Sequence, residues 1–391
     1  MNAPEKRIRR AVTVSVYTVL ALVLMAGLLA LAACDSSDAE TETTASVPVE
    51  TTASTTVSSD TTSTTSPVTD TIYPTDAIYP STTATTLAKV DKVTLVAPPG
   101  PMAIPLAYMA VNDKLADVAK ETELVIWENA EQLKAIVSGG QGDFVTVPSN
   151  NAAVFYNKGM ELQLLNIAVW NITYLITSDA DVESLADIKG QSLVVSLQGS
   201  VPDVMFQYLA MKEGLDPKKD FKLRYVSDPT QAAQLLLAGE VDNAVLSEAL
   251  ATNVILKSKD TKTPLTRAFA FDEAWMAATA RSEDTPIAGT VALKTVLDKP
   301  EVLAAFEREY QAAVEWMLAD PEAAGEFMET ELPDLGLKAD VMTASLQSIT
   351  WKYTSASDAM WYLNRFYGRL LELSPEVIGG QLPDDEFYHT Q

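Results

Sequence analysis

Cysteine and histidine are nearly absent from this chain of 391 residues, which contains one of each. A single cysteine excludes an intrachain disulfide. Together the two counts exclude structural zinc sites of the Cys/His type, two-histidine metalloproteases and paired Cys-His catalysis. A Ser-His-Asp site would have to use His389 in the polar C-terminal tail, where chains are usually poorly ordered. We therefore expect neither a metal nor a cofactor.

Basic residues are also scarce. Lys and Arg number 28 against 53 Asp and Glu, which gives a formal net charge of −25. Phosphate backbones attract positive charge, so nucleic-acid binding is not expected. The chain has no glycine-rich phosphate loop ending in Lys-Ser/Thr, and Gly139-Gly140-Gln141-Gly142 lacks the spacing of a dinucleotide fingerprint. A glycosidase-like pair of carboxylates stays open on counts alone, because pairs arise by chance among so many acids.

The single cysteine, Cys34, follows a segment typical of an export signal. Residues 1–10 are basic, residues 11–33 are apolar, and the segment ends in Leu31-Ala32-Ala33-Cys34. This string resembles the bacterial lipoprotein box, and the resemblance implies cleavage before Cys34 and a lipid on its thiol. The alternative is an uncleaved anchor, because the apolar run is close to the ~20 residues that cross a bilayer. Either way the remaining chain lies outside the cytoplasm, since the arginines stay inside.

After Cys34 the composition changes to Ser, Thr and Pro, up to about residue 88. Such a segment lacks the apolar side chains that a core needs and is predicted to be a disordered tether. The whole chain is too long for one compact domain. The predicted plan is a signal peptide at 1–33, a tether at 34–88, a first lobe from 89–170 and 275–391, and a second lobe from 171–274.

Apolar strand patterns alternate with helical patterns in two sets. The first set has strands at 93–97, 124–127, 144–147 and 162–169, and helices at 104–120, 130–137 and 150–158. The second set has strands at 192–196, 222–226 and 243–246, and helices at 202–212, 230–237 and 249–257. This alternation predicts an α/β fold with two lobes, each with a parallel sheet covered on both faces.

Two apolar runs, 162–177 and 265–278, are longer than one ordinary strand. We interpret them as two crossings between the lobes that lie side by side as a hinge. From Pro286 onward the pattern is helical, with helices starting near Pro300 and Pro321. Apolar residues at helical spacing in the first of these predict a core-facing stripe, formed by Leu303, Phe306, Tyr310, Val314 and Met317.

Several motifs of the second set carry a family resemblance. They are Gly199-Ser200-Val201-Pro202, Glu213-Gly214-Leu215-Asp216-Pro217, and Ala238-Gly239-Glu240-Val241-Asp242 followed by a strand and Glu248. These motifs resemble the solute-binding proteins of nitrate/sulfonate/taurine-type ABC importers, a group that includes proteins similar to thiamine-pyrimidine precursor binders. One departure is Ala249, where relatives often carry proline. The resemblance covers about residues 90–320 and implies a type II periplasmic-binding fold, whose two lobes close on a ligand in the cleft between them.

In open α/β sheets, ligands lie at the carboxyl ends of the strands, where loops lead into helix N-termini. The loop residues predicted to bind ligand are Gly100, Pro101, Met102, Ser149, Asn150, Gln198, Gly199, Ser200, Ser247 and Glu248. Asn171 and Thr173 stand at the first crossing, and Trp170 and Trp275 are candidates to stack on a flat ligand. The alternatives are ordinary helix caps for the loop residues and plain core for the tryptophans. Because these loops contain no Lys or Arg, an oxyanion bound by N–H groups and an organic, partly aromatic ligand both stay open.

The function expected from these features is a monomeric, lipid-anchored receptor on the outer face of the membrane. It would capture a sulfonate, taurine, nitrate or pyrimidine-like solute and present it to an ABC permease and its ATPase. One alternative is an enzyme of pyrimidine-precursor type on the same scaffold, although those enzymes use cysteine and histidine chemistry that this chain lacks. Another is a tethered ligand sensor.

Overall fold

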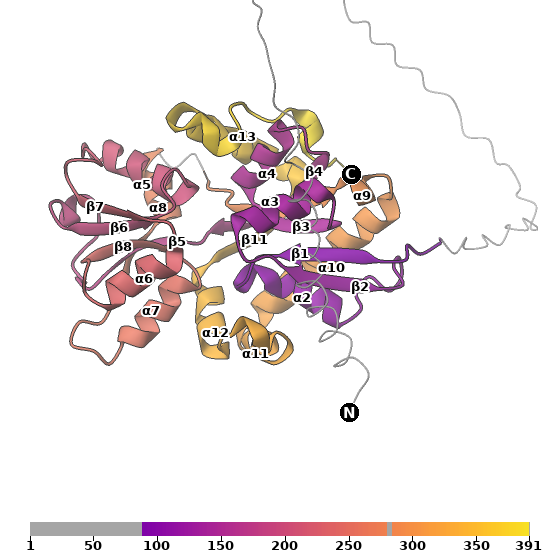
Figure 1. The fold of residues 1–391 in the computed structure, drawn as a ribbon, viewed down its shortest axis with the longest axis horizontal. Coiled ribbons are helices and arrows are strands. Elements are labelled where there is room, and N and C mark those ends of the chain that lie inside the picture. The colour runs from indigo at the N-terminus through magenta and orange to yellow at the C-terminus, as the bar shows by residue number, and fades with distance from the viewer. Residues whose placement is uncertain (1–87, 280–283, 391) are drawn as a thin grey trace, which may run out of the picture. The chain divides into compact units, whose positions relative to one another are not determined.

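The computed structural model describes residues 88–279 and 284–390, so the predicted signal peptide, Cys34 and the predicted tether up to residue 87 lie outside the described residues. The described chain forms two α/β lobes, each built around its own sheet (Figure 1). The predicted α/β class and two-lobed architecture are confirmed. No helix in the described part is both long and apolar enough to span a bilayer.

The first lobe has a six-stranded sheet in the order β11-β4-β10-β3-β1-β2. Strands β1, β2 and β3 run parallel, whereas β10 is antiparallel to both β3 and β4, and β11 is antiparallel to β4. The bounds are β1 Val93–Ala97, β2 Thr122–Ile126, β3 Phe144–Pro148, β4 Leu162–Asn171, β10 Ala288–Leu293 and β11 Thr350–Ser355.

The second lobe has a five-stranded sheet in the order β7-β6-β8-β5-β9. Strand β6 is parallel to β7 and β8, whereas β5 is antiparallel to β8 and β9. The bounds are β5 Thr173–Thr177, β6 Ser192–Ser196, β7 Lys222–Val226, β8 Asn243–Ser247 and β9 Thr266–Ala270.

Helices cover both faces of the first sheet. Successive side chains of each strand point to opposite faces, so each strand packs against both layers of helices. Leu95 and Phe144 pack with α2, α10, α11 and α12 on one face, and Val96 and Val145 pack with α3, α4 and α13 on the other. The bounds are α2 Ile104–Val111, α3 Ala130–Gly139, α4 Ser149–Asn157, α9 Lys294–Leu297, α10 Pro300–Ala319, α11 Pro321–Glu331, α12 Ala339–Ser348 and α13 Ala356–Leu373. The predicted stripe on α10 is confirmed, since all five of its side chains are buried.

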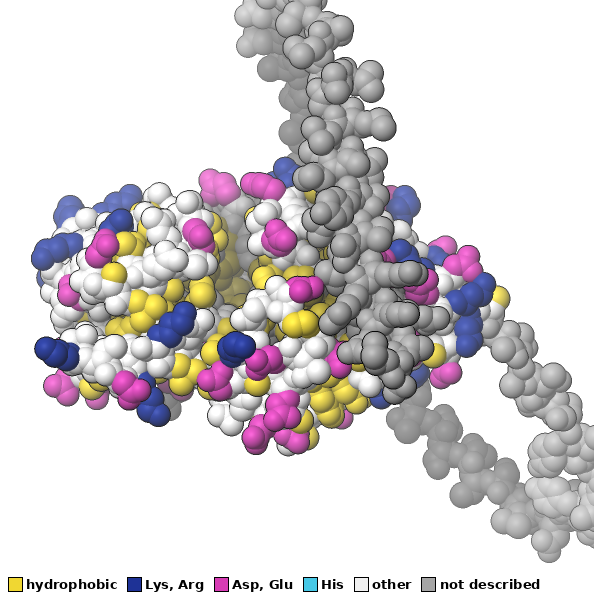
Figure 2. Space-filling view, turned by 60° about the horizontal axis from the view of Figure 1, so that its bottom comes forward, with side chains coloured by type: hydrophobic (Ala, Val, Ile, Leu, Met, Phe, Trp, Pro, Cys, Tyr) yellow, Lys and Arg dark blue, Asp and Glu magenta, His cyan; other side chains and the backbone are white. Residues whose placement is uncertain are grey.

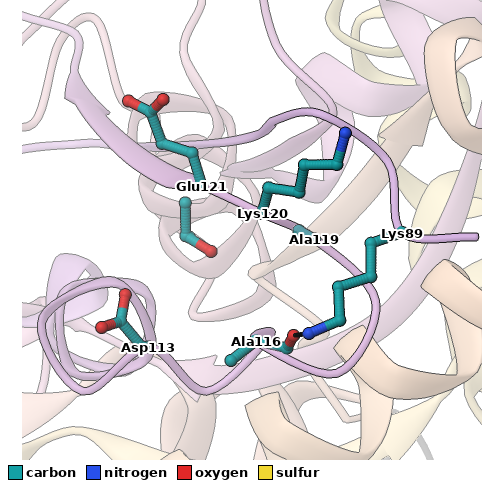
Figure 3. A pocket seen from close by; sticks show the side chains of 7 residues that line it. Lys89, Asp113, Ala116, Ala119, Lys120 and Glu121 are labelled. Atoms are coloured by element: carbon teal, nitrogen blue, oxygen red, sulfur yellow. Dashed lines mark hydrogen bonds between the residues drawn. The ribbon is translucent and has the colours of Figure 1, made fainter.

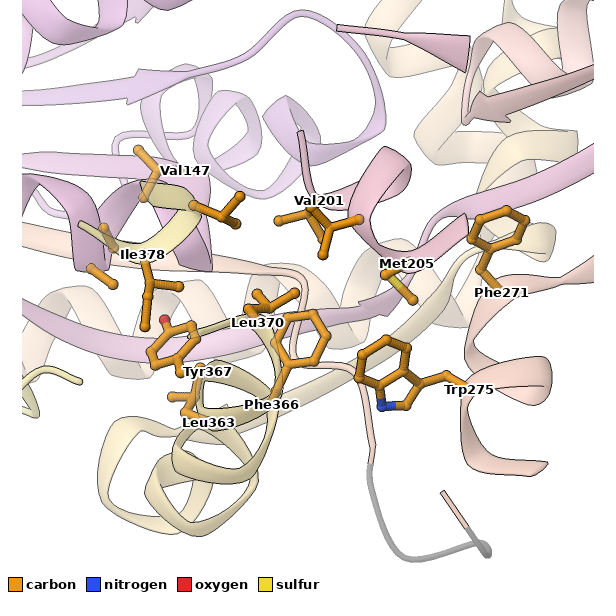
Figure 4. Close-up of a cluster of buried hydrophobic side chains, with 14 of the residues drawn as sticks. Val147, Val201, Met205, Phe271, Trp275, Leu363, Phe366, Tyr367, Leu370 and Ile378 are labelled. Atoms are coloured by element: carbon orange, nitrogen blue, oxygen red, sulfur yellow. The ribbon is translucent and has the colours of Figure 1, made fainter. Parts of the chain in front are cut away.

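The second sheet is covered by α6 and α7 on one face and by α5 and α8 on the other. The bounds are α5 Val201–Lys212, α6 Pro229–Leu237, α7 Leu250–Ser258 and α8 Phe271–Ala278. One hydrophobic cluster continues from α5 and α8 into α13 of the first lobe (Figure 4). Within it, Trp275 packs edge-on against Phe366 with ring centroids 5.5 Å apart, so the lobes share a dry contact on the α13 side.

The structure differs from the sequence prediction in the direction of some strands. Both sheets are mixed rather than parallel, because β10 and β5 run against their neighbours. The segment after Pro286 is not wholly helical, since it contains β10 and β11. An apolar strand pattern reports that a segment is buried but not the direction of its neighbours, and short strands between helices have little pattern of their own.

The first predicted crossing is confirmed, because β4 in the first sheet continues into β5 in the second. The second predicted crossing, at 265–278, is wrong: this run forms β9 and α8 within the second lobe. The chain returns later, and residues 285–287 then lie beside β4. Ile287 donates its N–H to the Val169 carbonyl at 2.9 Å, and the Thr285 hydroxyl donates to the Trp170 carbonyl at 2.5 Å.

Candidate functional site

The carboxyl ends of the parallel strands β1, β2, β3 and β4 lie at the boundary with the second lobe. Strand β4 ends at Asn171, next to Thr173, where β5 begins. Because β10 is antiparallel to both β3 and β4, these two strands run in the same direction. Pro148 and Val169 are both register partners of Ala288, so the end of β3 lies level with the hinge. The loops after β1 and β3 therefore open toward the second lobe.

The second sheet presents the same kind of edge to the hinge. Ser247, the last residue of β8, pairs with Thr173, the first residue of β5. Strands β6 and β7 are parallel to β8, so their carboxyl ends lie at this edge too. Loops from both sheets thus converge on residues 169–173, the position at which ligands bind in open α/β sheets. Figure 2 shows a recess between the two lobes with hydrophobic side chains along it.

The structure brings the predicted loop residues to this common edge. Gly100, Pro101 and Met102 follow β1, and Ser149 and Asn150 follow β3. Gln198, Gly199 and Ser200 follow β6, and Ser247 and Glu248 end β8 and begin the loop to α7. Whether each of them contacts a ligand stays a prediction.

Several of these side chains already have protein partners. The Ser149 hydroxyl donates to the Pro286 carbonyl at 2.5 Å, and Asn150 Nδ2 donates to the Val377 carbonyl at 3.1 Å. Asn171 Oδ1 accepts from Thr173 N–H at 3.1 Å, and the Thr173 and Ser247 hydroxyls lie 3.1 Å apart across β5 and β8. These bonds hold the hinge and the adjoining loops in a defined geometry.

Glu248 forms a buried ion pair that sequence analysis did not predict. Its side chain is fully buried, and Oε1 accepts from Arg267 Nη2 at 2.6 Å and Nε at 3.1 Å. Its Oε2 accepts from Thr252 N–H at 3.1 Å, in the first turn of α7. Arg267 lies on β9, and no local spacing connects it with Glu248. The ion pair therefore holds the loop between β8 and α7 in place.

Asp203 is a second residue that the sequence analysis missed. Its carboxylate is fully buried and accepts from Gly199 N–H at 2.8 Å and from the Tyr225 hydroxyl at 2.8 Å. The N–H group of Gly199, which we expected to face a ligand, therefore already has a partner. A capping box would not have predicted this contact, because Asp203 accepts from the residue before the N-cap Ser200, and Ser200 itself makes no side-chain cap bond.

The helix starts along the converging edge differ in charge. In the first lobe, α2 and α4 have no acidic residue in the first turn and no side-chain cap, whereas α3 is capped by Asn129 and has Glu131 in its first turn. In the second lobe, Asp203, Asp228 and Glu248 accept hydrogen bonds at the starts of α5, α6 and α7. The positive end of a helix favours negative charge. The starts of α2 and α4 therefore favour an anionic group more than the starts of α5, α6 and α7 do.

The two candidate stacking residues are buried. Trp170 donates its Nε1–H to the Lys352 carbonyl at 2.8 Å and packs edge-on against Tyr362, with ring centroids 5.3 Å apart. Trp275 is fully buried, and Figure 4 shows it beside Phe366 within the shared hydrophobic cluster. Both indoles therefore serve as core in this structure.

Asp272, in the first turn of α8, reaches the first lobe. Its Oδ2 accepts from the Thr350 hydroxyl at 3.3 Å, and its Oδ1 accepts from Glu273 N–H at 2.9 Å. Burial raises the pKa of this carboxyl above its ordinary value of 3.8. The folded protein therefore holds the proton more tightly than the unfolded chain. This contribution to stability is complete below the unfolded-state pKa and is lost as the pH rises through the folded-state pKa.

We expect Asp272→Asn to raise the urea midpoint at pH 7 and to leave it unchanged near pH 3. The amide removes the desolvated charge and can still bond to Thr350 and Glu273. Urea unfolding followed by circular dichroism at both pH values measures the difference. The exposed Asp117→Asn variant is the control and should show no pH-dependent gain. Equal midpoints for wild type and Asp272→Asn at pH 7 would contradict the assignment.

Two small hollows lie away from the converging loops. One is beside the first described residues, where Lys89 Nζ donates to the Ala116 carbonyl at 2.5 Å (Figure 3), and its lining also includes Glu121. The other lies between α11 and α12, and its lining includes Glu326 and Asp340. Neither is lined by a residue of the converging loops, so neither is the candidate site.

The described residues contain no group of His, Cys, Asp and Glu side chains arranged to hold a metal ion. The lone histidine, His389, places Nδ1 3.0 Å from Gln163 Oε1, and its N–H donates to the Leu164 carbonyl at 2.9 Å. These bonds tie the C-terminal segment to the edge of β4. The described contacts of His389 are thus structural and lie within the first lobe.

Solved structures of known proteins share this fold. An ABC transporter protein from Parabacteroides distasonis has a TM-score of 0.63 and 21% identity, covering 78% of this chain and all of that one. The aliphatic sulphonate binding protein SsuA from Escherichia coli has a TM-score of 0.56 and 15% identity, covering 74% of this chain and 96% of its own. SsuA from Xanthomonas axonopodis pv. citri, solved bound to MOPS, gives 0.54 and 15% over the same shares. At these identities the likeness shows the fold alone.

Sequence comparison gives the family. No curated protein sequence matches the chain. A family model described as "ABC transporter, phosphonate, periplasmic substrate-binding protein" matches residues 108–303, which is half of the chain. The match runs from α2 into α10 and includes the hinge and every loop of the second sheet. The chain therefore belongs to the family of periplasmic substrate-binding proteins of phosphonate-type ABC transporters.

Proposed function

We propose that this protein captures a small organic oxyanion between its lobes and delivers it to an ABC permease. Sulfonates and phosphonates are the first candidates. The observation that carries the proposal is the convergence of loops from both sheets on the hinge, with uncapped helix starts on the first-lobe side. The positive ends of α2 and α4, which have no acidic residue in their first turns, favour the charge of an oxyanion.

Several finer features belong to the same proposal. The names of two structural neighbours refer to sulphonate binding, which supports a sulfonate as a first candidate. Nitrate, taurine and pyrimidine-like ligands stay as predictions. Cys34 would carry a lipid that holds the protein at the outer face of the membrane. Loss of the protein from the membrane fraction on Cys34→Ser tests the anchor.

The ligand is identified first by mass spectrometry of small molecules that copurify with the protein. A thermal-shift panel of methanesulfonate, taurine, methylphosphonate, nitrate and a pyrimidine follows. A ligand at 100 times its Kd stabilises the folded protein by about 2.7 kcal/mol. We expect an organic oxyanion to give the largest shift. A shift with the pyrimidine and with none of the oxyanions would contradict the proposal.

Two glycines with similar positive φ values test the site itself. Gly199 and Gly214 have φ values of 80° and 77°, and an added Cβ would meet no atom within 4 Å at either. Valine at either position therefore causes similar backbone strain, but only Gly199 lies on the converging edge. We expect Gly199→Val to reduce the ligand-induced shift and Gly214→Val to leave it intact. Equal shifts in the two variants would remove the loop after β6 from the site.

A further inference from the structure

Leu197 combines two properties that do not favour a leucine. Its φ is 54°, in the left-handed region, and its side chain is 48% exposed. The left-handed region is unfavourable for a branched side chain, and an exposed side chain gains little from burial. Exposure alone says little, since Met211 is equally exposed in the outer part of α5. Neither the backbone conformation nor burial therefore explains why this position carries a leucine.

The other non-glycine residue with a positive φ in the described chain is of a type that commonly adopts this conformation. Apart from the glycines, only Asp113 and Leu197 have a positive φ among the described residues. Asp113 has a short polar side chain of the type that tolerates the left-handed region, in the turn after α2. Leu197 is therefore the exception, and strained residues of this kind cluster at functional sites.

Hydrogen bonds fix the backbone around Leu197. Its N–H donates to the Val226 carbonyl at 2.8 Å, and its carbonyl accepts from Ser200 N–H at 2.8 Å. The next turn is held by the buried Asp203, which accepts from Gly199 N–H at 2.8 Å. The loop therefore does not adapt to the leucine, and the fold itself determines where the side chain is presented.

Leu197 is the first residue after β6, at the edge where the loops of both lobes converge. We propose that Leu197 is a specificity-determining residue that contacts the hydrocarbon part of the bound oxyanion. This inference rests on the proposed function and assigns the second-lobe half of the site. The carboxylates at the second-lobe helix starts disfavour a second anionic group there, and the exposed apolar side chain of Leu197 favours an alkyl chain. The residue thereby separates alkyl sulfonates from small anions such as nitrate.

The test is isothermal titration calorimetry of the full-length protein with methane-, propane- and pentanesulfonate. Each buried methylene contributes about 0.8 kcal/mol, which is roughly a fourfold gain in affinity. We expect wild-type affinity to rise with chain length. In Leu197→Gly the rise should be smaller than in wild type, with pentanesulfonate bound about tenfold more weakly than by wild type and methanesulfonate within about twofold of wild type.

Stability provides the second measurement. Removing the strained leucine should raise the Tm of the ligand-free protein by about 2–4 °C. The matched control is Asp113→Gly, which relieves the other positive φ at a distance from the converging loops. It should leave every sulfonate affinity unchanged. A raised Tm with weaker pentanesulfonate binding in Leu197→Gly separates a role in binding from a role in folding.

Each outcome decides the proposal. If the chain-length dependence is as steep in Leu197→Gly as in wild type, or if wild type binds methanesulfonate without any such dependence, the role of Leu197 is overturned and the proposed function stands. If wild type binds none of the three sulfonates, both the role of Leu197 and a sulfonate ligand are overturned. Weaker binding of all three by the same factor would indicate a general disturbance of the loop and would also overturn a specificity role.

Discussion

Replacing Gly289 with alanine is expected to destabilise the protein by about 3 kcal/mol or more, through overpacking against backbone. Gly289 lies in β10, between β3 and β4. A Cβ built there would lie 1.8 Å from the Asn166 carbonyl oxygen and 2.8 Å from its carbonyl carbon. These are backbone atoms of β4 and cannot rotate away as a side chain could. Strand β10 would have to move away from β4, the strand that leads into the hinge.

Urea unfolding followed by circular dichroism measures this loss. The matched control is Gly368→Ala, because Gly368 lies within α13 and an added Cβ there meets nothing within 4 Å. Alanine favours a helix by about 1 kcal/mol over glycine, so this variant should be more stable than wild type. The same chemical change thus has opposite signs at the two positions. An unchanged midpoint for Gly289→Ala would show that β10 and β4 are not packed this closely.

Removing the Arg267 side chain is expected to cost about 3–5 kcal/mol, because breaking a buried ion pair leaves an uncompensated charge. The Glu248 side chain is fully buried, whereas that of Arg267 is 27% exposed. In Arg267→Ala the Glu248 carboxylate would keep only the Thr252 N–H among its described partners. The loop between β8 and α7 should loosen, so ligand affinity should fall together with the urea midpoint.

The double variant Arg267→Met/Glu248→Leu separates charge from packing. It removes both partners and should recover most of the stability lost in Arg267→Ala, since a hydrophobic pair can replace a buried ion pair. Lys120→Ala is the control, because Lys120 pairs with Asp91 at 2.6 Å but both side chains are largely exposed. Exposed pairs contribute little, so its midpoint should match wild type. A midpoint for Arg267→Ala equal to that of Lys120→Ala would contradict the role of the pair.

Much of the fold could be predicted from local patterns. The bounds of β1, β6 and β7 match the expected ranges, and the helix beginning at Pro300 buries its predicted stripe. The helix expected at 104–120 ends at Val111, because the chain then turns through Asp113 with a φ of 49°. Element type follows from the periodicity of apolar residues, whereas a turn at one residue leaves little trace in that periodicity.

The candidate site could be predicted only in part. The loops were identifiable because ligand sites follow the carboxyl ends of strands in this class of fold. The hydrogen-bond partners of those loops could not be predicted, because Arg267 lies on β9 and Tyr225 lies on β7, outside the loops themselves. Trp275 follows the same limit: its sequence context is compatible with a cleft, and its packing against Tyr208 and Phe366 places it in the core.

The sequence by itself determined the class of the fold, the existence of two lobes and the loops between strand and helix. Its single cysteine and its N-terminal segment, which is typical of an export signal, also led to the predicted compartment. Only the tertiary structure decided the antiparallel placement of β10, the bulged contact of Gly289 with Asn166, and the fixed left-handed backbone at Leu197. The physical reason is the separation of the interacting residues along the chain. Local periodicity records whether a residue is buried, whereas strand direction, ion pairing and close backbone contact depend on residues far away in the chain.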